Sequence, residues 1–307
     1  MSEKTATLAL IKRNVKCFFK DKGMFITSLI TPIILLFLYV TFLYDVYKTT
    51  YVEVLPPDFV YDEKLIDGMV GGLLLSSLLA VSTITVSFCA NLAMVQDKVT
   101  GARRDFTIAP IKPRTLAIGY YISTAINALI IAFVATLLGC VYLAFSGWYL
   151  SFTDVLAFLL DVLLLTLFGT ALSSLICYPL TSQGQLSAVG TIISAGYGFI
   201  CGAYMPLSQY GGGLQKVLSF FPGTYGTSLL RNHALQGVYE EMQAQGFPKE
   251  ALEEMRAVAD CDPQFFSHTV EVWQMYLILG VSIALLVFAY ILINYLSNRP
   301  KKSKDKK

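Results

Sequence analysis

The sequence predicts an all-α polytopic membrane protein with six transmembrane helices, and three observations support that fold class. Hydrophobic residues make up 55% of the 307 residues and charged residues 14%, with a mean hydropathy of +0.60. This composition is too apolar for a soluble domain of this size. Uncharged runs long enough to cross a bilayer recur along the chain. The basic residues are gathered into a few short segments that these runs separate from one another.

The basic segments predict the topology. Seventeen of the 23 Lys and Arg residues lie in 4–22, 98–114 and 299–307, and short loops rich in Lys and Arg stay in the cytoplasm. We therefore expect a multi-pass protein of the inner or plasma membrane of a prokaryotic cell, with both termini cytoplasmic and the more acidic regions outside. Because the net charge is only +2 and the basic residues flank apolar runs, the sequence indicates contact with membrane lipid and no nucleic-acid partner.

The sequence predicts a cytoplasmic amphipathic connecting helix over residues 1–22. Leu8, Ile11, Val15 and Phe18 recur at helical spacing, while lysines and one arginine dominate the other positions. Such a helix lies flat on the inner leaflet, or it is an ordinary basic anchor with no further role. Both interpretations leave the topology unchanged.

Six apolar runs predict the spans of one transmembrane domain over residues 23–296, on the basis that a crossing helix needs roughly 20 apolar residues. The predicted spans are 23–44, 68–95, 116–145, 155–178, 186–204 and 272–296. Residues 179–185 are expected to form a cytoplasmic turn between the fourth and fifth spans, although they contain no Lys or Arg. Residues 297–307 are expected to be a basic cytoplasmic tail.

Two predicted outer regions connect these spans. Residues 45–67 form an outer loop, and residues 205–271 form an outer re-entrant and extracellular region. In the second, Met205-Pro206 and the glycines at 211–213 break any helix, and an apolar stretch at 214–221 ends at Pro222-Gly223. This pattern is typical of a re-entrant or interfacial element. Further on, Pro248 is suitably placed to begin a polar helix over 249–259.

The loop between the second and third spans, 97–114, predicts a short amphipathic helix. Five apolar residues follow helical spacing: Val95, Val99, Ala102, Phe106 and Ala109. Pro110 and Pro113 would end the helix, and Arg103, Arg104 and Asp105 project elsewhere on its surface. Such a helix docks on a soluble partner, or it rests on lipid headgroups.

The order of residues in this loop resembles a known family. Asp97, Gly101 and then Ala109-Pro110 resemble the coupling-helix signature of the ABC-2 family of ATP-driven exporter membrane subunits. Downstream, the segment Gly202-Ala-Tyr-Met-Pro206, the segment 218–225 and Arg231 resemble that family's outer re-entrant segment and its Pro-x-x-Tyr and Arg signature. Residues 11–22, leading into a span with Pro32, are also similar. The chain departs from the commonest pattern with Asp97 in place of Glu and Pro222-Gly223 in place of Asn-Pro.

The resemblance implies a permease subunit of a type V exporter-like ABC transporter. The implied ATPase-coupling residues are Asp97, Gly101, Arg103, Arg104, Asp105 and Phe106, and the implied outer-motif residues are Pro206, Pro222, Tyr225 and Arg231. Two permease copies, or this subunit with a related one, would sit on two separate ATP-binding subunits that hold ATP and Mg. The chain has no Gly-x-x-x-x-Gly-Lys-Ser/Thr loop, so we expect a transporter subunit with no cofactor and no enzymatic activity of its own.

Polar stripes inside two spans suggest a translocation path. The candidate path residues are Ser76, Thr83, Ser87 and Asn91 in the second span and Ser187, Ser194 and Tyr197 in the fifth. The resemblance implies that these two helices surround a dimer cavity. The alternative is close helix packing, because small residues let helices approach and hydroxyls bond between them. Asn127 and Gly139 in the third span are interpreted as packing features.

Asp161 is the only ionisable residue well within a predicted span. A carboxylate near mid-membrane costs about 3 kcal/mol on insertion scales, so it needs a partner or a proton. A proton relay would need a second acid, a Lys or an intramembrane His, and none is expected nearby. His233 and His268 are both expected outside, too far apart in sequence to predict a metal site.

Two other functions stay open at this point. The chain could be an ATP-independent channel or an ion-coupled secondary transporter, which would need intramembrane charges or broken helices at mid-depth. It could also be a scaffold whose acidic outer segment, 240–262, binds an extracellular protein. The transported substrate and the choice between homodimer and heterodimer are not determined by the sequence.

Overall fold

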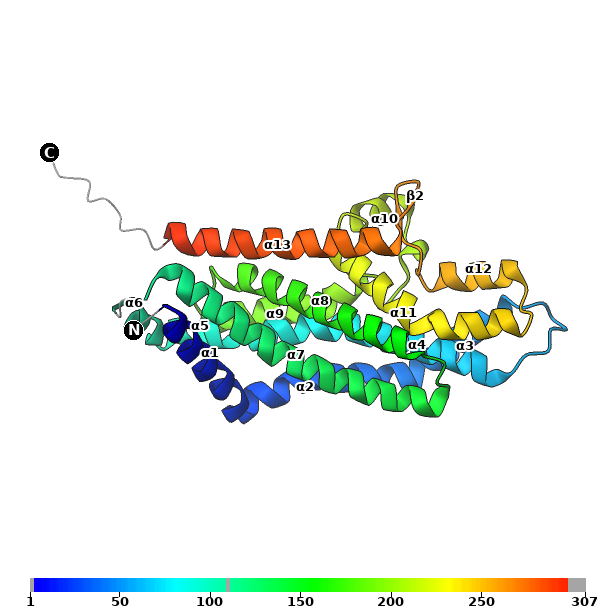
Figure 1. Cartoon of the computed structure of the whole chain (residues 1–307), viewed down its shortest axis with the longest axis horizontal. Coiled ribbons are helices and arrows are strands. Elements are labelled where there is room, and N and C mark those ends of the chain that lie inside the picture. Colours follow the sequence, from blue (N-terminus) through cyan, green and yellow to red (C-terminus); the bar gives the residue numbers. More distant parts are fainter. Residues whose placement is uncertain (1–2, 109–110, 298–307) are drawn as a thin grey trace.

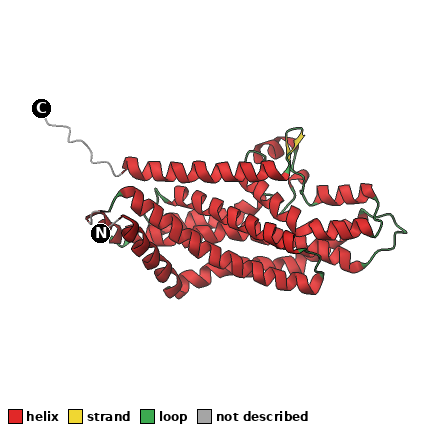
Figure 2. Cartoon of the chain, in the orientation of Figure 1, coloured by secondary structure: helices red, strands yellow, loops and turns green. Residues whose placement is uncertain are grey.

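The computed structural model describes residues 3–108 and 111–297 and consists of a long bundle of helices with one pair of short strands in that part of the chain (Figures 1 and 2). Within the described residues, five helical stretches are long and apolar enough to cross a membrane. They are Lys22–Glu53, Glu63–Val99, Pro113–Ser146, Phe152–Cys177 and Val272–Ser297. The chain is therefore a multi-pass membrane protein.

The first span follows the amphipathic helix directly. Helix α1 (Glu3–Lys20) ends before Asp21, whose carboxylate accepts hydrogen bonds from the backbone N–H groups of Gly23 and Met24 and so begins α2 (Lys22–Leu38). A π-helical segment, η1 (Tyr39–Leu43), and α3 (Tyr44–Glu53) continue the same stretch. Helix therefore occupies both ends of the predicted outer loop at 45–67. Buried Tyr47 and Tyr51 give α3 an apolar face that its polar composition conceals.

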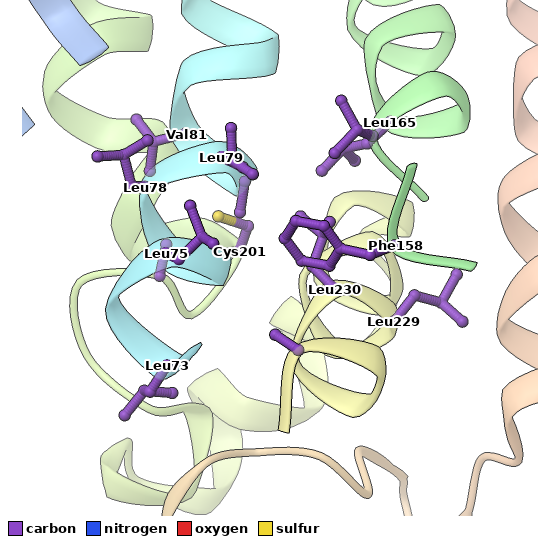
Figure 3. Close-up of a cluster of buried hydrophobic side chains, with 14 of the residues drawn as sticks. Leu73, Leu75, Leu78, Leu79, Val81, Phe158, Leu165, Cys201, Leu229 and Leu230 are labelled. Atoms are coloured by element: carbon purple, nitrogen blue, oxygen red, sulfur yellow. The ribbon is translucent and has the colours of Figure 1, made fainter. Parts of the chain in front are cut away.

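The second span is the centre of the bundle. Helix α4 (Glu63–Ala90) is buried along nearly its whole length because α2, α7, α8, α9 and α11 pack around it, and α5 (Leu92–Val99) extends it. Leu75 and Leu79 of α4 meet Phe158 of α8 and Leu230 of α11 in the core (Figure 3). Gly139 of α7 is a packing feature, because a Cβ there would lie 2.0 Å from the Leu75 side chain.

Three long helices complete the apolar bundle: α7 (Pro113–Ser146), α8 (Phe152–Cys177) and α13 (Val272–Ser297). Their bounds lie within three residues of the predicted third, fourth and sixth spans. Large apolar side chains of α2, α7 and α13 are exposed on the bundle surface, for example Phe37, Leu137 and Phe288 at about two-thirds of their area. These faces suit contact with lipid.

The predicted fifth span corresponds to α9 (Gln183–Ile200), which is not among the five stretches that qualify by length and composition. Its 18 residues include two Gln and four Gly, which lower its apolar content. After Cys201 the chain turns back through Gly202, whose φ is +76°, and continues as η2 (Leu207–Gln209) and α10 (Gly212–Leu218). The glycines at 211–213 do not exclude a helix, since Gly212 and Gly213 open α10.

The largest departure from the predicted outer region is α11 (Pro222–Ala244), a helix of 23 residues that packs against α4, α8 and α13. Its small and polar residues are buried, so an apolar stripe does not reveal it. Helix α12 (Lys249–Val258) agrees with the predicted polar helix within one residue. The strands β1 (Gln264–Phe265) and β2 (His268–Thr269) then form a hairpin before α13. Helices α3 and α12 lie at one end of the molecule, here called the α12 end, and α1 and α6 lie at the other, the α6 end (Figure 1).

Candidate functional site

The predicted single helix through the 97–114 loop is two helices in the structure. Helix α5 ends at Val99, and α6 (Ala102–Ile108) begins after Gly101, whose φ of +83° lies in the left-handed region. That conformation suits glycine and ends the first helix. Val95 and Val99 therefore belong to α5, Ala102 and Phe106 belong to α6, and Ala109 lies outside the described residues.

Asp97 is a buried junction of three helices at the α6 end. Both of its carboxylate oxygens accept hydrogen bonds from the Arg13 guanidinium of α1, with Nη2 2.7 Å from Oδ1. The Tyr120 hydroxyl of α7 donates to Oδ2 at 2.7 Å. A paired guanidinium and carboxylate of this kind is the stronger and more directional type of hydrogen-bonded pair. Asp97 thus fixes α1 and α7 to the end of the central helix.

Arg13 also reaches the following helix. Its Cζ lies 5.4 Å from the centre of the Phe106 ring of α6, within the range of a cation–π contact. The hydrogen bonds to Asp97 raise the pKa of Arg13 above its ordinary value. Beside it, Asn14 Nδ2 donates to Ser123 Oγ of α7 at 3.2 Å. The sequence did not single out Arg13 and Asn14 as functional residues, because the regularly spaced apolar residues between 8 and 18 define a different face of α1.

At the same end, Lys98 of α5 holds the turn between α8 and α9. Lys98 Nζ donates to the carbonyl oxygens of Tyr178 and, at 3.0 Å, Leu180. Lys98 Nζ and Arg103 Cζ lie 5.1 and 5.4 Å from the centre of the Tyr178 ring, and that ring meets Tyr290 of α13 edge to face. Residues 179–185 contain no Lys or Arg, but Lys98 of α5 and Arg103 of α6 supply basic side chains at this turn.

The remaining predicted coupling residues have less defined surroundings. Asp105 is exposed on α6, and Phe106 is half-buried beneath Arg13. The Arg104 side chain lies outside the described residues. The structure thus brings Asp97, Arg103 and Phe106 into contacts with neighbouring helices and leaves Asp105 at the surface.

The polar stripe of α4 is fully buried between helices of the same chain. Asn91 Nδ2 donates to Ser173 Oγ of α8 at 2.6 Å, and Asn91 Oδ1 accepts from Thr124 Oγ1 of α7 at 3.3 Å. Ser87 Oγ lies 3.4 Å from Thr170 Oγ1 of α8. Ser76 and Thr83 bond to carbonyl oxygens of α4 itself. In this structure, packing accounts for the stripe.

The polar stripe of α9 differs because part of it is accessible. Ser187 is exposed and Ser194 is half-buried, while Tyr197 is buried at 2% of its area. The Tyr197 hydroxyl has no hydrogen-bond partner among the described residues. Of the two stripes, only that of α9 offers a polar surface at the edge of the chain.

The outer-motif residues surround a buried ion pair. Arg231 is 1% exposed, and it donates to the Gly202 carbonyl oxygen at 2.6 Å and to Ser77 Oγ of α4 at 3.3 Å. Its Nη1 lies 3.4 Å from Oδ2 of Asp260, a residue held at φ +49° just after α12. Burial raises the pKa of Asp260, and the nearby positive charge of Arg231 opposes that rise. This pair ties α4, α11 and the turn after α12 together.

The three other outer-motif residues shape the backbone around that pair. Pro222 begins α11, and Pro206 precedes η2. The Tyr225 hydroxyl donates to the Ser219 carbonyl oxygen at 2.6 Å, which closes the chain between α10 and α11. Asp260 itself accepts a hydrogen bond from the backbone N–H of Leu207.

Asp161 has partners that the sequence did not reveal. The prediction that no histidine accompanies it is wrong, because His233 Nδ1 lies 2.6 Å from Asp161 Oδ2. The Tyr276 hydroxyl of α13 donates to Oδ1 at 2.6 Å. The error follows from α11, since a segment assigned to the outer region packs directly on α8. Within the described residues, no group of three His, Cys, Asp or Glu side chains could hold a metal.

Comparison with known proteins assigns the chain to a family. The family model described as ABC-2 type transporter matches residues 5–234, which include most of α1, the α5–α6 region, α9 and most of α11. A search of the curated proteins found no match. Because the match covers well over half of the sequence, the chain belongs to the ABC-2 type transporter family and is a membrane permease of that family.

Proposed function

We propose that the chain is the permease subunit of an ATP-driven exporter, with the α6 end in the cytoplasm and the α12 end outside. The basic segment 4–22 and the basic residues of α5 and α6 lie at the α6 end, while the acid-rich stretch 240–262 lies at the α12 end. Clusters of Lys and Arg favour the cytoplasmic side. In this proposal α9 is the sixth crossing helix, shielded in part by neighbouring subunits, and residues 201–221 re-enter the outer leaflet.

The proposed coupling runs from α6 to the central helix through Asp97. A separate ATP-binding subunit that presses on α6 would move Phe106 and the Arg13 guanidinium above it. Arg13 is bonded to Asp97 at the end of the 37-residue central stretch Glu63–Val99, so the displacement would reach α4 and α7 together. This bidentate contact is the observation that carries the proposal.

The partners follow from the same reasoning. ATP and Mg would be bound by two copies of the ATP-binding subunit, because this chain has no phosphate-binding loop of the Walker type. A second permease, identical or related, would pack on α9. That helix exposes a run of small residues at helical spacing, which lets helices approach closely in a membrane: Gly184, Ser187, Ala188, Thr191 and Ala195.

The test is ATP hydrolysis by the complex purified from membranes and reconstituted in lipid. Replacement Arg13→Gln should lower hydrolysis by about two- to thirtyfold, the range typical of lost coupling, while the ATP-binding chain still copurifies. Lys16→Gln is the matched control, because Lys16 is an exposed cation on the same helix, and it should hydrolyse ATP at the wild-type rate.

Two results would count against the proposal. Wild-type hydrolysis by the Arg13→Gln complex would separate the Asp97 contact from coupling. Purification of the chain without any ATP-binding subunit, with solute movement in vesicles driven by an ion gradient alone, would favour an ion-coupled transporter instead.

A further inference from the structure

A buried polar cluster joins three helices near the α12 end, away from the coupling region. Asp161 of α8 is 1% exposed, and its two oxygens are each held at 2.6 Å, one by His233 Nδ1 of α11 and the other by the Tyr276 hydroxyl of α13. Tyr276 belongs to the first two turns of α13. Helix α13 otherwise presents much of its surface outward, and this hydrogen bond attaches its first turns to the bundle.

The charges of the cluster depend on one another. A carboxylate inside a membrane-spanning helix is stable only when it is paired or protonated. A protonated His233 supplies both a hydrogen-bond donor and a neutralising positive charge, whereas Tyr276 supplies only a donor. Loss of the proton from the imidazole would leave Asp161 as a buried, uncompensated negative charge.

We propose that Asp161, His233 and Tyr276 form a proton-binding site that fastens α13 to α8 and α11. The proton enters on His233, whose side chain is 18% exposed, and it is held between the ring and the buried carboxylate. When the site is protonated, α13 is locked to the bundle. When the proton leaves, the attachment weakens and the first turns of α13 separate more often.

The surroundings of His233 fix the direction of the effect. Burial lowers the pKa of His233, but the hydrogen bond to Asp161 and the negative charges of Asp161 and Asp154 outweigh burial and raise the pKa above its ordinary value. In the separated state His233 regains an ordinary pKa near 6.5. A group whose pKa is raised in the closed state stabilises that state at low pH, and the stabilisation is lost as the pH rises through the raised pKa.

Hydrogen exchange of the whole protein in lipid, measured by mass spectrometry between about pH 6 and pH 9, tests the site on the wild-type chain. After correction for the intrinsic dependence of amide exchange on pH, exchange in residues 272–280 should rise by up to about tenfold per pH unit above 6.5 until the raised pKa is reached. Exchange in α7, corrected in the same way, should stay constant. A flat corrected profile for 272–280 would overturn the proposal.

Variants test which residue is responsible for the pH dependence of exchange in residues 272–280. His233→Gln should exchange rapidly at every pH in residues 272–280, with no slope, and Tyr276→Phe should also raise exchange there at low pH, because it removes the hydrogen bond by which α13 joins the cluster. His268→Gln is the matched control, since His268 is the other histidine of the chain and lies on β2. A slope that persists in His233→Gln or disappears in His268→Gln would contradict the assignment. If His233→Gln does not fold, the wild-type and His268→Gln profiles still decide the question.

Discussion

The two ends of the bundle are each held by an arginine–aspartate pair, but the two pairs differ in burial and in what they bind. At the α12 end, the Arg231 and Asp260 side chains are 1% and 8% exposed, and Arg231 also holds the backbone of Gly202. At the α6 end, Arg13 is 38% exposed, and its partner Asp97 is 9% exposed. One pair is sealed inside the protein, and the other has one member in contact with solvent.

The difference in burial predicts that the two ion pairs differ in how easily they rearrange. A buried pair is costly to break, because either partner alone becomes an uncompensated charge in a low-dielectric interior. A half-exposed pair can rearrange at lower cost, because water can replace the lost partner. The Arg231–Asp260 contact is therefore the costlier of the two to rearrange, whereas the Arg13–Asp97 contact can yield to the movement that the proposed coupling requires.

The largest expected effect comes from breaking the sealed pair. Arg231→Met removes the counter-charge of Asp260 and the donor to the Gly202 carbonyl oxygen, and should lower the free energy of unfolding by about 3–5 kcal/mol. Thermal unfolding of the purified protein in detergent measures the change. Arg114→Gln at the α6 end is the control, because Arg114 pairs with Glu3 and both side chains are about half exposed, and it should cost no more than about 1 kcal/mol. Equal losses in the two variants would remove the distinction between the ends.

A second expectation compares how tightly helices approach at the two ends. A Cβ on Gly237 of α11 would lie 1.9 Å from the backbone oxygen of Tyr149, which cannot move without shifting the chain. A Cβ on Gly119 of α7 would lie 2.4 Å from the side-chain tip of Leu10, which can rotate away. Gly237→Ala should therefore destabilise the protein by about 2–3 kcal/mol and Gly119→Ala by less. Thermal unfolding with the opposite order would show that the α12 end is not the more rigid one.

The apolar half of the fold could be predicted from the sequence, because length and hydropathy are sufficient to locate a spanning helix. The stretches 116–145, 155–178 and 272–296 agree closely with α7, α8 and α13. Helix α11 could not be found in this way. It is buried through small and polar residues such as Gly226, Thr227 and Ser228, which carry no apolar periodicity, so its packing is set by the surrounding helices.

For each arginine–aspartate pair, the sequence pointed to one residue but not to its partner. Asp97 and Arg231 stand out by their order along the chain, but their partners Arg13 and Asp260 lie 84 and 29 residues away. A pairing across such separations is determined by tertiary packing, which one sequence does not display. The partner of Asp161 was missed for the same reason, since His233 is supplied by the helix that the sequence did not reveal.

The smallest expected effect concerns the hinge that separates α5 from α6. Gly101 has open space around it but a φ of +83°, so Gly101→Ala should cost about 1–2 kcal/mol through backbone strain alone. Gly101→Asn should cost less, because asparagine adopts the left-handed conformation more readily. The same two variants should lower ATP hydrolysis by the complex in that order, since the strain favours fusing α5 and α6 into one helix that carries Phe106 away from Arg13. Equal stability and equal hydrolysis in the two variants would mean that the left-handed turn at Gly101 is not needed to hold α6 against α1. The coupling proposed for the α6 end would then depend on the Arg13–Asp97 pair alone.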